Sequence, residues 1–258
     1  MAGRRQIEDV FENKFSTRHS LIYLGAIFCT SLCILFAIYS SFPKLTEDEK
    51  THIKIPWNLD DAKMLGTVLN KYKEDHFYQV FSGVCITYIF LQTFAIPGSL
   101  FLSVLSGFLF PFFIALVLVC TCSALGASLC FMISQFVGRK LIQKYFPEKA
   151  NAWAVTVNKH KDNLLNYVIF LRVTPFLPNW FINLTAPVIG VPLVPFALGT
   201  FIGVAPPSFI ALQAGQTLHN MSASDSAMSW TSISLLMLFG VLSLIPILFK
   251  DKLKKKFD

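Results

Sequence analysis

The chain contains a stretch from residue 76 to residue 138 without a single Asp, Glu, Lys or Arg. A second stretch, from 163 to 249, holds only Arg172 and Asp225 as charged residues. A helix needs about 20 apolar residues to cross the hydrocarbon core of a bilayer, so each stretch is long enough for several membrane elements. With 54% apolar residues and a mean hydropathy of +0.56, the chain is predicted to be an all-α polytopic membrane protein, not a soluble, disordered or collagen-like one.

The basic residues are concentrated in the segments that flank the apolar stretches, over 1–19, 43–76, 139–162 and 250–258. They produce a net charge of +7. No helix combines them with interleaved aromatic side chains, so nucleic acid is not expected as a partner. Segments rich in Lys and Arg usually stay in the cytosol. We therefore expect the N-terminal tail, residues 139–162 and the C-terminal tail to be cytosolic.

Residues 20–42 are the first predicted crossing. As a helix they would span about 33 Å, which is too long for a signal-peptide core, and no small-residue cleavage site follows, so we expect a signal anchor. The loop 43–76 then lies in the lumen and is expected to contain an amphipathic helix that Asn58 caps. Asp60 and Asp61 fall in the first turn of that helix, and a lumenal gate or a partner contact is the alternative role for them.

Prolines interrupt the first uncharged stretch. The segment between Pro97 and Pro111 reaches only about 20 Å as a helix, which is too short to cross a core of about 30 Å. Proline also removes a backbone donor and clashes with the preceding helical turn. We therefore predict that residues 77–110 form a re-entrant hairpin entered from the lumen, and that a full crossing over 112–137 follows.

Prolines interrupt the second stretch as well, at Pro175, Pro178, Pro187 and Pro192. By the same reasoning we expect a second re-entrant hairpin there, entered from the cytosol because both ends of the stretch are cytosolic. Full crossings over 193–217 and 227–249 are expected to follow.

The two proline-broken regions match each other after a shift of 81 residues, with Pro97 on Pro178 and Pro111 on Pro192. Since they enter the membrane from opposite sides, this match indicates an inverted repeat with a central site between its halves. The predicted fold therefore has two inverted re-entrant helical hairpins and about four full crossings. After the lumenal loop, residues 77–217 form the predicted core. Residues 218–249 form a lumenal turn and the last transmembrane helix, and residues 250–258 form a basic cytosolic tail.

Broken backbone at membrane depth is tolerated only where it is buried in protein or lines a wet cavity, so the hairpins are the expected functional site. Their polar side chains are expected to line a path for a lipid headgroup: Ser99, Ser103, Ser106, Thr174, Asn179, Asn183 and Thr185. Arg172 is the only strong cation in the embedded part. It either binds a phosphate through its planar fork or extends to the cytosolic headgroups as a topology anchor. The shape of the hairpins is expected to depend on Pro97, Gly98, Pro175 and Pro178. Gly107 and Pro111 are further candidate residues of the lipid path and re-entrant loops.

Several motifs in these regions resemble the DedA-type, or VTT-domain, family of membrane proteins. They are the runs 94–98, 106–111 and 170–180, together with Gly138-Arg139. The resemblance covers roughly residues 43 to 258. It implies a phospholipid scramblase of the endoplasmic reticulum with two facing re-entrant loops, which serves autophagosome formation, lipid droplets and lipoprotein export. The partners it implies are membrane phospholipids, with sterol as a further candidate, and membrane proteins of autophagy or lipid handling.

One departure from the wider family bears on mechanism. Bacterial members place acidic residues around the first re-entrant loop, where they suit proton coupling. This chain has Ser99 after Pro97 and Gly98, and it has no carboxylate from 76 to 147. The absence of acidic groups at depth favours passive lipid movement. An ion-coupled secondary transporter and a membrane-shaping scaffold without transport remain the alternatives.

No catalytic motif accompanies these features, so an enzyme is not expected. The chain lacks a Gly-x-Ser-x-Gly elbow, a His-Glu-x-x-His pair and a phosphate loop ending in Gly-Lys-Ser or Gly-Lys-Thr. Its six cysteines lie in apolar segments without metal-ligand spacing, so we expect no metal, no cofactor and no disulfide. Near the C-terminus, Lys255 and Lys256 resemble the cytosolic dilysine retrieval signal of endoplasmic-reticulum membrane proteins.

Overall fold

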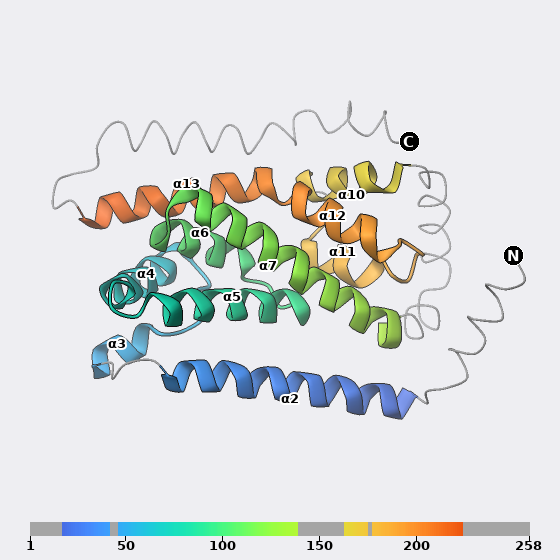
Figure 1. Cartoon of the computed structure of the whole chain (residues 1–258), viewed down its shortest axis with the longest axis horizontal. Helices are drawn as coiled ribbons and strands as arrows, with labels where there is room; N and C mark the ends of the chain where they lie inside the picture. Colours follow the sequence, from blue (N-terminus) through green and yellow to red (C-terminus); the bar gives the residue numbers. More distant parts are fainter. Residues whose placement is uncertain (1–16, 42–45, 139–162, 175–176, 224–258) are drawn as a thin grey trace, which may run out of the picture.

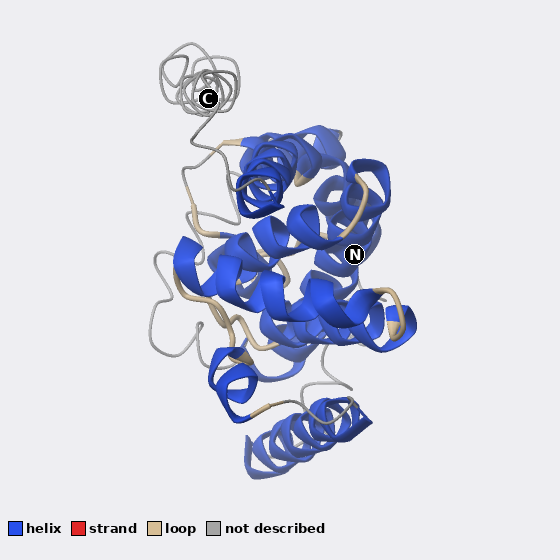
Figure 2. Ribbon diagram, turned by 90° about the vertical axis from the view of Figure 1, so that its left-hand side faces the viewer, coloured by secondary structure: helices blue, strands red, loops and turns tan. Residues whose placement is uncertain are grey.

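A computed structural model describes residues 17–41, 46–138, 163–174 and 177–223 (Figure 1). Every regular element in these ranges is a helix, as Figure 2 shows, so the predicted all-α class is confirmed. The helices are α2 Thr17–Ser41, α3 Glu47–His52, α4 Leu59–Lys73, α5 Phe77–Thr93, α6 Ser99–Leu109, α7 Phe112–Ile133 with the π-helical turn η1 Ser134–Gly138, α10 Leu164–Val173, α11 Asn179–Thr185, α12 Leu193–Gly203 and α13 Ala205–Ala223.

Three helical segments among the described residues are long and apolar enough to cross a membrane, over Ile22–Ser41, Phe112–Phe136 and Leu193–Asn220. They coincide with the first three predicted crossings. The fourth predicted crossing, 227–249, lies outside the described residues. The chain is therefore a multi-pass membrane protein. Two shorter apolar helices in the described part of the chain, α6 and α10, are too short to cross.

The third span differs from the single helix that the sequence predicts. It consists of α12 and α13, which meet at Val204. Pro206 and Pro207 lie in the first turn of α13, where the N–H groups of a helix have no intrahelical partner and proline is tolerated. These two prolines explain why the helix restarts there.

Helices α5 and α6 form a hairpin. The Lys73 amino group, just before α5, donates a hydrogen bond to the carbonyl oxygen of Leu109 at the end of α6, over 2.9 Å. The rings of Phe77 and Phe110 are also in contact, with 6.0 Å between their centroids. Helix α6 thus returns to the point where α5 begins.

Helices α10 and α11 correspond to the predicted second hairpin, and α12 packs against α10. Glycines allow the close contact between α10 and α12, because a Cβ at Gly199 would lie 2.8 Å from the Val168 side chain and one at Gly203 would lie 2.7 Å from the Arg172 Cβ. In Figure 1 the α5–α6 hairpin lies toward the α4 end of the molecule and the α10–α11 hairpin toward the opposite end.

The helix starts follow the repeat seen in the sequence. Pro111 precedes α7 and Pro192 precedes α12, each as the N-cap residue, with ψ angles of 143° and 150°. Both prolines therefore stand at the start of a span that is long enough to cross a membrane, which agrees with their pairing under the shift of 81 residues.

Helices α6 and α13 pack backbone against backbone. A Cβ added at Gly107 would overlap the carbonyl oxygen of Leu212, and one at Gly215 would overlap that of Val104. Small residues at helix contacts are how membrane proteins gain close packing without a hydrophobic driving force between helices. This contact holds the first hairpin against the third span.

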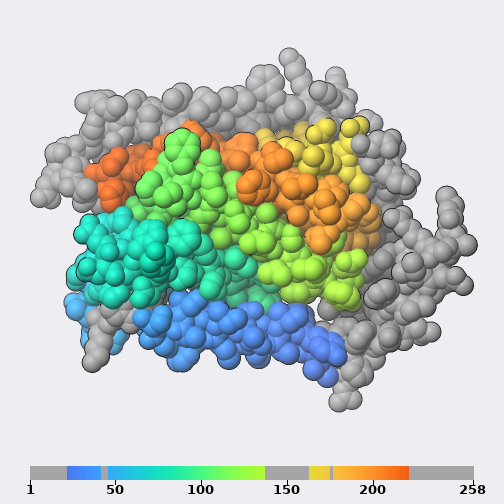
Figure 3. Space-filling model, viewed as in Figure 1, coloured from blue at the N-terminus to red at the C-terminus, as the bar shows by residue number. Residues whose placement is uncertain are grey.

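The predicted helix of the 43–76 loop is present as α4, and Asn58 caps it as expected, with its side-chain oxygen accepting from the Asp61 N–H over 2.7 Å. Its apolar face, which includes Ala62 and Leu65, is buried in the protein, mainly against α6. The Asp61 carboxylate also pairs with Lys54 at 2.7 Å. Figure 3 shows α2 along the lower edge of the body, and the end of α2 lies near α3, below the first hairpin.

Candidate functional site

A buried polar network joins the two hairpins. Arg172 donates from one terminal nitrogen to the side-chain oxygen of Asn183 over 2.6 Å and from the other to that of Asn179 over 3.0 Å. Asn183 in turn donates to the side-chain oxygen of Gln92 over 3.3 Å. Asn183 is fully buried, and Arg172 and Gln92 are 5% and 7% exposed. Hydrogen-bonding groups therefore meet in the middle of an otherwise apolar body.

Two members of the network stand at similar positions in the two hairpins. Gln92 is the last residue but one of α5, and Arg172 is the last residue but one of α10. Each therefore stands where the first arm of its hairpin ends and the proline-containing turn begins. Asn183, on the second arm of the second hairpin, contacts both.

The charge of Arg172 has no acidic partner in the sequence around it, because no Asp or Glu occurs from 76 to 147 or from 163 to 224. Its guanidinium lies 5.2 Å from the centre of the Phe196 ring, a cation–π contact. Its Nε–H is buried without a hydrogen-bond partner among the described residues. A buried cation with a free donor suits an anionic group such as a phosphate.

This position does not agree with the topology-anchor alternative for Arg172. A snorkelling arginine keeps its charged head in water at the membrane surface. Here the head is turned inward, toward the asparagines of α11. The phosphate-binding alternative is compatible with this geometry.

A second polar cluster lies inside the first hairpin. The Tyr88 hydroxyl is 3.1 Å from the Ser103 hydroxyl and accepts a hydrogen bond from Ser123 over 3.1 Å. All three side chains are buried, and they connect α5, α6 and α7. None of them carries a charge at neutral pH.

Most of the hydroxyls predicted to line a lipid path bond to their own helices. Ser103 donates to the carbonyl oxygen of Ser99, Ser106 to that of Leu102, Thr174 to that of Phe170, and Thr185 to that of Phe181, over 3.0, 2.7, 2.6 and 2.8 Å. Ser106 and Thr174 are buried, and Ser99 is partly exposed. The network of Asn179, Asn183 and Arg172 is thus where the predicted residues come together.

The predicted shape residues stand at the turns and helix starts. Gly98, with φ +127°, adopts a conformation that other residues rarely take, and it follows the exposed Pro97 at the turn of the first hairpin. Pro178 is the N-cap of α11 and Pro111 that of α7. Pro175, Lys255 and Lys256 lie outside the described residues.

Reasoning from the sequence missed Gln92, Tyr88 and Ser123. The available signal was simple, because an uncharged polar side chain inside an uncharged, apolar run has to find a partner in the protein. The prediction concentrated instead on polar residues within the two proline-broken segments. Among the described residues, no three His, Cys, Asp or Glu side chains are grouped as a metal site would require.

The chain is similar over nearly its whole length to known membrane proteins. The VTT domain matches residues 96–217. Transmembrane protein 41B of Pongo abelii is 56% identical over 243 residues, which are 94% of this chain and 84% of the relative. The chain belongs to the VTT-domain family. The same protein of Homo sapiens is 55% identical with the same coverage, and that of Xenopus tropicalis is 56% identical over 94% of this chain and 87% of its own. No solved structure matches.

The VTT domain begins immediately before Pro97 and ends within α13. It thus includes the turn of the first hairpin and all of the second, with Arg172 and Asn183. Gln92, which completes the network, precedes the domain, and so does α2. The transmembrane protein 41B relatives match 94% of this chain, so the similarity to them extends well beyond the VTT domain.

Proposed function

We propose that this chain is an energy-independent phospholipid scramblase of the endoplasmic reticulum membrane. The observation that carries the proposal is the buried network of Arg172, Asn183 and Gln92, which places polar groups between two broken hairpins without any carboxylate beside them. Lipid exchange between leaflets requires a polar route for the headgroup next to an apolar wall for the tails. The buried network supplies the polar groups of this proposal, and the apolar helices around it supply the apolar wall.

The energetic requirement is modest compared with the cost of an unassisted crossing. Moving a charged headgroup into a medium of low dielectric has an idealised cost of order 20 kcal/mol per ion. A route that lowers the effective barrier by about 8 kcal/mol accelerates the crossing roughly a million-fold. Amide groups, a guanidinium and carbonyls freed at the prolines are groups that can do this, and no bond is made or broken. The proposal therefore includes neither an enzymatic step nor a cofactor.

The proposed membrane arrangement has two re-entrant hairpins that enter from opposite faces and about four full crossings. Its support is the pairing of Pro111 with Pro192 at the two helix starts and the opposite placement of the hairpins along the molecule (Figure 1). The charge distribution of the sequence supports cytosolic N- and C-termini. The dilysine pattern of Lys255 and Lys256 supports residence in the endoplasmic reticulum.

The cellular roles proposed here follow from the family resemblance. They are support of autophagosome formation and of lipid droplet and lipoprotein homeostasis, which consume lipid from one leaflet and need it replaced from the other. Phospholipids are the proposed partners in the membrane, with sterol as a further candidate, and membrane proteins of autophagy or lipid handling are the proposed protein partners.

Purified full-length protein in liposomes tests the proposal. A fluorescent phosphatidylcholine in both leaflets is exposed to an impermeant reductant, and the bleached fraction is measured with no ATP and no ion gradient. A scramblase raises the bleached fraction from about half to nearly all. Loss of flux without a proton or cation gradient would instead identify an ion-coupled transporter. Bleaching equal to that of empty vesicles under every condition would leave the scaffold alternative.

A further inference from the structure

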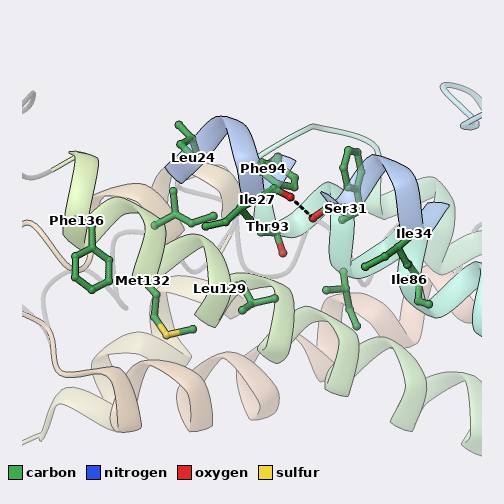
Figure 4. Close-up of a pocket in the computed structure, with 13 residues that line it drawn as sticks. Leu24, Ile27, Ser31, Ile34, Ile86, Thr93, Phe94, Leu129, Met132 and Phe136 are labelled. Carbon is green, nitrogen blue, oxygen red and sulfur yellow. Dashed lines mark hydrogen bonds between the residues drawn. The ribbon is translucent and has the colours of Figure 1, made fainter. Parts of the chain in front are cut away.

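Helix α2 packs against α5 and leaves a groove beside this contact. It contacts α5 through Phe28, whose ring centroid is 5.8 Å from that of Phe90 and 4.9 Å from that of Phe94. The groove between α2, α5 and α7 has a volume of about 410 Å³ (Figure 4). Its two long walls are formed by α2 and α7, through Leu24, Ile27, Ile34, Leu129, Met132 and Phe136.

The dimensions of the groove fit a segment of one lipid tail. From Leu24 to Ile34 the α2 wall is about 15 Å long at the rise of a helix. This is half of the hydrocarbon core of about 30 Å, the depth that the tails of one leaflet fill. The volume lies within the range of ligand sites in proteins, about 300 to 1,000 Å³.

One polar atom in the groove has no partner. The Thr93 hydroxyl oxygen is buried and makes no hydrogen bond with any residue that the structure describes, although Thr93 is 6% exposed and lines the groove. Figure 4 shows Thr93 between the α2 and α7 walls. Leaving a buried hydroxyl unpaired is unfavourable, so a ligand that accepts a hydrogen bond there is stabilised. The next residue along α5 toward the N-terminus is Gln92 of the polar network.

We propose that this groove binds an acyl chain of a diacyl phospholipid, and that the Thr93 hydroxyl donates a hydrogen bond to the ester carbonyl oxygen of that lipid. Helix α2 is then a wall of a lipid site as well as a membrane anchor. This inference rests on the proposed function, because it places the tail of the lipid beside Gln92, where the headgroup route begins.

Photolabelling of the full-length protein in liposomes tests the site. The probe is a phosphatidylcholine with a diazirine in one acyl chain, and the adducts are mapped by mass spectrometry. We expect adducts at Ile27 and Met132 in clear excess over Leu32, which is exposed on α2 outside the groove. Ile27→Trp fills the groove and removes the adducts on α7, whereas the matched Leu32→Trp leaves them. Equal labelling of Ile27 and Leu32 would overturn the proposal.

Two further variants isolate the hydrogen bond. Thr93→Val removes the hydroxyl and is expected to lower groove labelling about fivefold, the equivalent of one ordinary hydrogen bond, while Thr93→Ser retains it. Unchanged labelling in Thr93→Val would contradict the role of Thr93. Displacement of the probe by excess sterol would assign the groove to a sterol and overturn the choice of ligand.

The two proposals can fail separately. Groove labelling in wild-type protein that moves no lipid between leaflets would reject the scramblase function and leave the lipid site standing. Rapid lipid movement without groove labelling would reject the site and leave the function standing.

Discussion

Asn183 donates a hydrogen bond to Gln92 over 3.3 Å and so joins two hairpins across 91 residues of sequence. The same asparagine accepts from Arg172. Its side chain thus uses both its donor and its acceptor to hold the ends of α5 and α10 together. A change at this residue should affect both hairpins, which makes it the first place to test the site.

Replacing Asn183 with leucine should impair the protein more than any other single asparagine change in the second hairpin. The variant leaves a terminal nitrogen of Arg172 and the Gln92 oxygen unpaired and buried, at a cost of about 1–3 kcal/mol each. We expect a lower unfolding midpoint and a lower rate of lipid exchange in liposomes. Asn166→Leu, at an exposed position of α10, is the control and should behave like wild type.

Arg172→Gln should slow the movement of lipids that carry a phosphate. If Arg172 contacts the phosphate, its removal lowers their exchange rate about tenfold, which corresponds to about 1.4 kcal/mol. Arg172→Lys keeps the charge but loses the planar fork, so an intermediate rate is expected. The informative comparison is with a fluorescent glucosylceramide, which has no phosphate. An equal loss of rate for both lipids would show that Arg172 acts only on the fold.

Gly107→Ala should destabilise the protein because the new Cβ would overlap the carbonyl oxygen of Leu212. Forcing an extra methyl group into a close-packed contact costs about 1–3 kcal/mol. The measurement is the thermal unfolding midpoint in detergent. Gly25→Ala on α2, where a Cβ meets nothing within 4 Å, provides the matched control. A similar midpoint for both variants would mean that α6 and α13 are not in such close contact.

The contact between α3 and α4 should weaken in acid. A hydrogen bond from Lys71 at 2.6 Å, together with bonds from the Thr46 backbone and the Tyr72 hydroxyl, lowers the pKa of Glu49 to about 2 from the ordinary 4.5. Because the folded pKa is the lower one, this stabilisation is complete above pH 4.5 and is lost as the pH falls toward 2. Hydrogen-exchange protection of α3 should therefore fall over that range.

The control for this pH dependence is a pair of variants. Glu49→Gln should show weak protection of α3 that no longer changes between pH 5 and pH 2.5, whereas Asp48→Asn, on the same helix, should titrate like wild type. A wild-type profile in Glu49→Gln would assign the acid sensitivity to another carboxylate.

The crossings could be predicted because hydrocarbon imposes a strict requirement on length and charge. The first three predicted crossings therefore match the described spans closely, and Pro111 and Pro192 indicate where two of them begin. The break at Val204 was missed, because two adjacent prolines are equally compatible with the first turn of a new helix and with a bend in a single one.

The polar network was only partly predictable. Arg172 drew attention as the only strong cation in the embedded part, and Asn179 and Asn183 as polar residues in a proline-broken segment. Gln92 did not, because its partner is 91 residues away and no local pattern reports a contact of that range. The burial of Arg172 depends on glycine at 203, which lets α12 approach α10, and this too is a property of the assembled helices.

The contact between α6 and α13 limits how this protein can change shape. Gly107 faces the Leu212 carbonyl and Gly215 faces the Val104 carbonyl, so sliding one helix along the other would drive larger neighbouring residues into the backbone. The two helices are therefore expected to move together as a single rigid unit. In the proposed scramblase, a lipid that passes between the two hairpins would therefore displace the second hairpin, whose α11 has seven residues, and not α6 or α13.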